Sequence, residues 1–149
     1  MLCEAASFYP EKKKAYIKIA ESIGDVIWSE GLLLKGNGLC HGIAGNAYML
    51  HTLHRVFIRF YKESKDDEEQ QNLMLRSIYW RDRCLEFVKA MYDEKIQEAC
   101  SEHNNFGARM TQGVPDYPWS LMEGLSGEIC LLSDLLTNEN KVRFPGFEI

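Results

Sequence analysis

The chain has 149 residues, with 17 basic and 22 acidic side chains, so its formal net charge is −5. This length suits one domain of ordinary size, and an apolar fraction of 46% is enough for a substantial core. The sequence contains no basic block that could neutralise a run of phosphates, which excludes nucleic acid as an expected partner. An anionic small molecule would need a local cluster of positive charge instead.

The cysteine pattern indicates a reducing, cytoplasmic setting. The cysteines are odd in number and form no C-x-x-C pair, which argues against a disulfide framework and against a zinc ribbon. They are Cys3, Cys40, Cys84, Cys100 and Cys130. The first residues reach charged positions too early for a signal peptide, and no stretch approaches the roughly 20 apolar residues of a membrane span. Peripheral membrane association is not derivable from the sequence.

Apolar periodicity predicts an all-α protein with four helices in chain order. The first spans residues 11–30, where apolar side chains recur at intervals of three and four, and the second spans residues 45–61. A more charged third helix spans residues 69–91, and a short, strongly apolar fourth helix spans residues 125–136. Between residues 94 and 118 the periodicity is lost, which predicts a long loop. No segment shows the alternation that is typical of a strand.

An internal repeat organises these helices. The motif His41-Gly42-Ile43-Ala44-Gly45 aligns with Glu123-Gly124-Leu125-Ser126-Gly127, and an apolar helix follows each copy. A partial third copy appears when residues 1–5 are aligned with residues 49–53. The repeat unit is therefore a G-x-x-G turn, an apolar helix, a loop and a more polar helix. This alternation predicts an inner and an outer helical layer, with about two and a half inner helices, too few to close a ring.

The first G-x-x-G turn carries the two side chains most suited to catalysis or metal binding. Cys40 and His41 are adjacent, so from the residues alone they could form a nucleophile with its base, part of a metal site, or only a helix entry. A catalytic dyad is disfavoured, because neighbouring residues rarely aim a thiolate and its base at one another. A metal site and a simple helix entry remain open at this point.

Three segments closely resemble the lanthionine synthetase C-like proteins of animals. They are LLKGNGLCHG at residues 33–42 with GNAY at 45–48, YPWSLMEGLSG at 117–127, and RFPGFEI at 143–149. The resemblance implies an α/α toroid with a zinc ion at its mouth, held by two cysteines and one histidine. Cys40 and His41 match the second cysteine and the histidine. The whole chain, residues 1–149, would then be the C-terminal part of a longer toroid domain, and the N-terminal part of that domain would be absent from it.

The resemblance also implies a chemistry. Members of the family are linked to binding glutathione and to adding its thiol to dehydroamino acids in peptides or proteins. On this basis Cys40 and His41 are the expected zinc ligands, and His41 is the expected catalytic residue. Lys35, Glu123 and Arg109 are the expected substrate-binding residues, although Lys35 could equally be a surface lysine and Glu123 a helix-entry carboxylate.

Two other functions remain as alternatives. A non-catalytic glutathione-binding or signalling adaptor would need the loop at the mouth of the ring but not the complete zinc site. A glycosidase-like toroid would use paired acids such as Asp116 and Glu123. That second alternative leaves Cys40 and His41 without a role, and it ranks last.

Overall fold

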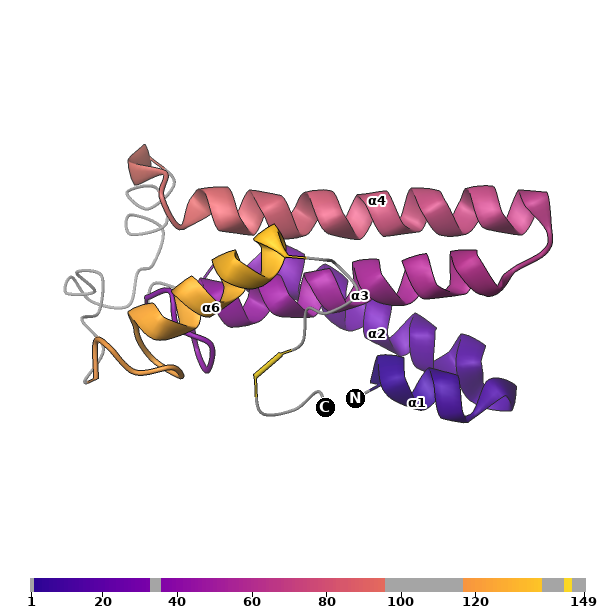
Figure 1. The fold of residues 1–149 in the computed structure, drawn as a ribbon, viewed down its shortest axis with the longest axis horizontal. Helices are drawn as coiled ribbons and strands as arrows, with labels where there is room; N and C mark the ends of the chain where they lie inside the picture. The colour runs from indigo at the N-terminus through magenta and orange to yellow at the C-terminus, as the bar shows by residue number, and fades with distance from the viewer. Residues whose placement is uncertain (1, 33–35, 96–116, 138–143, 146–149) are drawn as a thin grey trace.

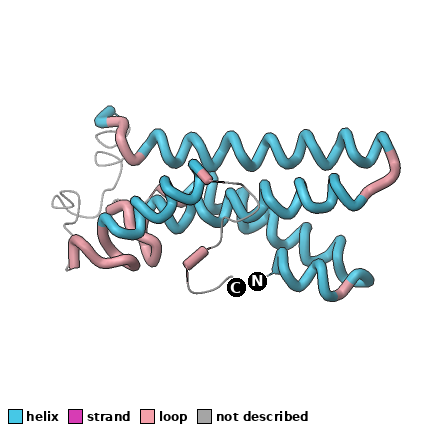
Figure 2. The backbone as a smooth tube through the Cα atoms, viewed as in Figure 1, coloured by secondary structure: helices cyan, strands magenta, loops and turns pink. Residues whose placement is uncertain are grey.

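A computed structural model describes residues 2–32, 36–95, 117–137 and 144–145, and all regular structure within these ranges is helical. Figures 1 and 2 show the arrangement. The helices are α1 (Leu2–Phe8), a short 3-10 helix (Pro10–Lys12), α2 (Lys13–Glu30), α3 (Ile43–Glu63), α4 (Asp67–Ala90) and α6 (Leu125–Leu136). The four helices predicted from the sequence are confirmed, and their ends shift by only a few residues. Most of the predicted loop at residues 94–118 lies outside the described residues.

Helices α3 and α4 form an antiparallel hairpin that runs along the length of the molecule (Figure 1). The connection between them is short because α4 begins at a strong N-terminal signal. The Asp66 carboxylate accepts a hydrogen bond from the Glu69 backbone N–H at 2.7 Å, and three acidic residues occupy the first turn. Both features stabilise the positive end of the helix dipole.

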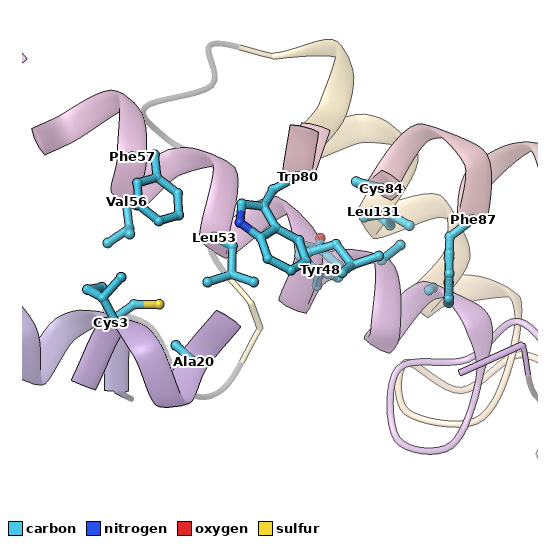
Figure 3. Close-up of a cluster of buried hydrophobic side chains, with 14 of the residues drawn as sticks. Cys3, Ala20, Tyr48, Leu53, Val56, Phe57, Trp80, Cys84, Phe87 and Leu131 are labelled. Atoms are coloured by element: carbon cyan, nitrogen blue, oxygen red, sulfur yellow. The ribbon is translucent and has the colours of Figure 1, made fainter. Parts of the chain in front are cut away.

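The hairpin has a buried inner helix and a more exposed outer helix, as the repeat predicts. Helix α3 is buried on most of its surface, whereas α4 buries one stripe and turns its charged residues to solvent. Figure 3 shows the core that lies between the helices, with Trp80, Tyr48, Phe57 and Phe87 among its largest fully buried side chains. None of the described helices is both long and apolar enough to cross a bilayer.

Helix α2 packs closely against the hairpin at a glycine. A Cβ atom added to Gly24 would lie 2.6 Å from Leu53 Cδ1 of α3 and 2.7 Å from the Trp80 ring of α4. Two ion pairs at the margin of this contact, Arg76 with Glu21 and Arg83 with Asp25, join α4 to α2. Helix α2 can therefore pack this closely against α3 and α4 only because Gly24 has no side chain.

Candidate metal centre

Two glycine turns meet at one end of the molecule and build the candidate site. Residues 36–42 lead into α3 and residues 117–124 lead into α6, in the same order as the two copies of the sequence repeat. The Cys40 backbone N–H donates a 2.8 Å hydrogen bond to the carbonyl of Met122. Gly38 lies against the second turn so closely that a Cβ there would be 2.4 Å from the Glu123 carbonyl carbon. The repeated turns thus pack on each other.

The first turn is also closed onto the start of α3. The Ile43 and Gly45 backbone N–H groups donate to the carbonyls of Gly36 and Gly38, each at 3.3 Å. Gly36 has a φ of 102°, which lies in the left-handed region where side chains are rarely tolerated. These bonds leave Cys40 and His41 at the tip of the turn.

The side chains of Cys40 and His41 are exposed and in contact. The Cys40 Sγ lies 2.7 Å from His41 Nδ1 and 3.2 Å from His41 Nε2. Adjacent residues rarely direct a thiol and an imidazole at each other, and here they do, because the tight turn folds both side chains to the same side. Among the described residues no third group orients the His41 ring, which a nucleophile–base pair would need.

The donor types at this turn fit zinc. Zinc binds thiolate sulfur at about 2.3 Å and imidazole nitrogen at about 2.0 Å, so the two donors of one tetrahedral site sit about 3.5 Å apart. Cys40 and His41 are closer than this, and their exposure leaves room to open by rotation. A catalytic site uses three protein ligands, and no group of three His, Cys, Asp or Glu side chains suited to a metal occurs in the part of the chain that the structure describes.

The structure places one of the other expected site residues beside this turn. Glu123 is partly buried, its backbone packs against Gly38, and its N–H donates to the Ser120 hydroxyl at 3.1 Å. The second turn therefore brings Glu123 to the same end of the molecule as Cys40. Lys35, Arg109 and Asp116 lie outside the described residues.

A buried carboxylate below the turns was not identified from the sequence. Glu128, in the first turn of α6, is 8% exposed. It accepts a 2.9 Å hydrogen bond from the Asn37 side-chain amide and another from the Tyr92 hydroxyl. Burial, and then the bond to Glu128, raises the pKa of Tyr92 to about 12. The sequence signal that could have revealed this carboxylate is an acidic residue within α6, the most apolar of the described helices.

Two further side-chain hydrogen bonds hold the inner helices in place behind the site. Asn46 in α3 donates to the Gly31 carbonyl at 2.7 Å, which satisfies a free carbonyl at the end of α2. The Tyr48 hydroxyl donates to Asp134 of α6 at 2.5 Å, and burial together with this bond raises the pKa of Tyr48 far above its ordinary value. The start of α3 is therefore fixed to both α2 and α6.

Comparison with known proteins identifies the arrangement. The sequence profile described as "Lanthionine synthetase C-like protein" matches residues 1–149. The chain belongs to this family. Its fold is accordingly part of the family's α/α toroid, which confirms the predicted fold class, and the burial of α3 and the exposure of α4 agree with an inner and an outer layer.

The chain is also similar to two curated relatives. It is 35% identical over 136 residues to "Glutathione S-transferase LANCL1" of Danio rerio, an alignment that covers 91% of the chain and 26% of the relative. It is 28% identical over 148 residues to "LanC-like protein GCL1" of Arabidopsis thaliana, covering 99% of the chain and 27% of the relative. The chain thus spans about a quarter of the length of these relatives.

Proposed function

We propose that this chain supplies Cys40 and His41 as two ligands of a zinc site at which the thiol of glutathione is activated for addition to dehydroamino acid residues of a peptide or protein. The observation that carries the proposal is the exposed Cys40–His41 pair, held on a glycine turn that packs against the second glycine turn of the repeat. The name of the Danio rerio relative, a glutathione S-transferase, supports glutathione as the thiol substrate.

The proposed reaction is a conjugate addition. The glutathione thiol loses its proton, and its sulfur forms a bond to the β-carbon of the dehydroamino acid while the π bond of the alkene breaks. The α-carbon then takes a proton, which leaves a thioether. Zinc, when bound, lowers the pKa of a coordinated thiol so that the nucleophilic thiolate is present at neutral pH. No oxidant or reductant is consumed.

The residues of this chain have separate roles in the proposal. Cys40 and His41 bind the ion and hold it on the turn. Glu123, on the second turn beside Gly38, positions the substrate or supports the ligands through its carboxylate. Lys35 and Arg109 are the cationic side chains proposed to pair with the carboxylates of glutathione.

Cobalt(II), which can replace zinc and absorbs visible light, tests the metal site directly. We expect the chain to bind cobalt weakly, because two protein ligands leave the ion under-coordinated, with a thiolate-to-metal charge-transfer band. Glutathione adds a thiolate ligand and should raise the apparent cobalt affinity about tenfold or more, whereas S-methylglutathione should not. Cys40→Ser should abolish both effects, and the control Cys130→Ser, on α6, should retain them.

The outcomes separate the competing functions. A charge-transfer band that survives Cys40→Ser would overturn the assignment of the metal ligands. Glutathione binding that is unchanged by the removal of metal would favour the non-catalytic adaptor instead. Transfer of glutathione to a dehydroalanine peptide, measured by mass spectrometry with and without added zinc, then decides whether the bound thiol reacts.

A further inference from the structure

We infer that Glu128 is the positioning residue of the Cys40–His41 turn, acting through Asn37 and anchored by Tyr92. The expected effect of Glu128 on metal binding rests on the proposed function, whereas its effect on the geometry of the turn does not. The hydrogen bonds of Glu128 go to Asn37 and Tyr92 and not to Cys40 or His41. It acts on the residues that carry them.

The carboxylate of Glu128 joins three segments that are distant in the sequence. One oxygen, Oε2, accepts from the Asn37 amide at 2.9 Å, and the other, Oε1, accepts from the hydroxyl of Tyr92, just beyond the end of α4. Glu128 itself belongs to the first turn of α6. Glu128 is only 8% exposed, so these two bonds are the main compensation for burying its carboxylate.

The position of Asn37 explains how the anchor reaches Cys40. Asn37 lies between Gly36 and Gly38, whose carbonyls accept the Ile43 and Gly45 N–H groups of α3. A residue flanked by two such bonds cannot shift without opening the turn. Fixing the Asn37 side chain to α6 therefore fixes the loop that presents Cys40 three residues later, in register with the second turn.

A reciprocal exchange of donor and acceptor tests the inference. Asn37→Asp places two carboxylates face to face and should open the turn, whereas Glu128→Gln can still accept from Asn37 and should have a small effect. In the double variant Asn37→Asp with Glu128→Gln, the amide introduced at position 128 would donate to the carboxylate introduced at position 37, while its oxygen accepts from Tyr92. The double variant should therefore recover most of what Asn37→Asp loses.

Two readouts follow the turn on the full chain. The first is hydrogen exchange of the Cys40 backbone N–H, which donates to Met122, in the absence of metal. Asn37→Asp and Glu128→Leu should each raise its exchange rate at least about tenfold, and the double variant should return it near the original rate. The second is the apparent cobalt affinity, which should fall and recover in the same order.

Asp134→Asn is the matched control. It weakens the Tyr48–Asp134 bond, which also anchors α6 but joins it to α3 without touching the turn. It should lower overall stability while leaving both readouts within about threefold of the original chain. If Asn37→Asp changes neither readout in a folded protein, or if the double variant fails to recover, the inference is wrong. If the original chain binds no cobalt, the proposed function fails, and the exchange series still decides the role of Glu128.

Discussion

At the scale of single residues, two histidines of α3 are buried in the core. His51 and His54 are both 3% exposed, and their rings lie edge to face with centroids 5.4 Å apart. His54 Nδ1 lies 2.7 Å from the Ser77 hydroxyl of α4. The distance along the helix from His41 to His51, about 15 Å for ten residues, excludes His51 from a metal site at the turn. Both histidines therefore belong to the core.

The burial of His51 predicts an acid-sensitive fold. Burial, and then electrostatic repulsion from His54, Arg55 and Arg81, lowers the pKa of His51 to about 3. The unfolded chain titrates this group near about 6.5, so below that pH the unfolded state binds a proton that the folded state does not. The contribution of His51 to the free energy of unfolding is complete above about pH 6.5. It is lost as the pH falls, by about 1 kcal/mol for each pH unit between about pH 6 and pH 4.

Urea denaturation of the original chain and of His51→Leu at several pH values checks this prediction. The difference in the pH slope of the unfolding free energy between the two proteins isolates His51 from the acidic residues, which titrate in both. A slope that is the same in both proteins would show that His51 is not the group responsible.

At the scale of elements, the helices are held together by close approach rather than by long apolar interfaces alone. Helix α2 approaches α3 and α4 at Gly24, and the start of α3 approaches the turn before α6 at Gly38. Glycine in a helix lowers intrinsic helix stability by about 1 kcal/mol relative to alanine. Gly24 is therefore explained by the interhelical contact and not by the helix itself.

Substitution of Gly24 by alanine should destabilise the protein despite the gain in helix propensity. The new Cβ would lie 2.6 Å from Leu53 Cδ1 and 2.7 to 2.8 Å from two atoms of the buried Trp80 ring, which cannot rotate away. Overpacking of this kind costs about 1–3 kcal/mol, so we expect a net loss of about 1–2 kcal/mol in unfolding free energy. Thermal denaturation measures it.

Ser22→Ala is the control for this substitution. Ser22 is exposed on α2, and its hydroxyl donates to the Ile19 carbonyl of the same helix. It should change stability by no more than about 0.5 kcal/mol. A stabilised Gly24→Ala variant would show that α2 does not approach the hairpin as closely as described.

At the scale of the whole molecule, the described helices bury one side of α6 and leave the other side open. Leu131 of α6 is fully buried, whereas Leu125, Ile129 and Leu136 are 39%, 52% and 89% exposed. These three residues recur at intervals of four and seven, so they lie on one face of the helix. A contiguous apolar face on an inner helix is expected to bind another apolar surface.

The chain should therefore self-associate in a concentration-dependent way. Ile129→Glu places a charge in the centre of the exposed face and should reduce association without unfolding the protein, since the position is half exposed in the monomer. Gln71→Glu, on an exposed position of α4 away from this face, adds the same charge as a control. Sedimentation velocity distinguishes the two, and equal association by all three proteins would contradict the prediction.

Local sequence patterns were enough to predict the helices and the two turns. Apolar spacing located α2, α3, α4 and α6, because each helix buries one face and the spacing records which face that is. The repeat of G-x-x-G predicted that His41 and Glu123 occupy equivalent positions at the starts of inner helices. The resemblance to the family added the expected zinc and glutathione chemistry.

Only the tertiary structure decided how the turns and side chains meet. The hydrogen bonds of Cys40 to Met122 and of Asn37 to Glu128 join different segments of the chain, and the apolar spacing within one segment does not determine which segments meet. The contact between Cys40 and His41 likewise depends on the backbone of a closed turn, which their adjacency in the sequence does not determine. Helical periodicity is a property of one segment, whereas the geometry of this site is produced by the packing of several segments on one another.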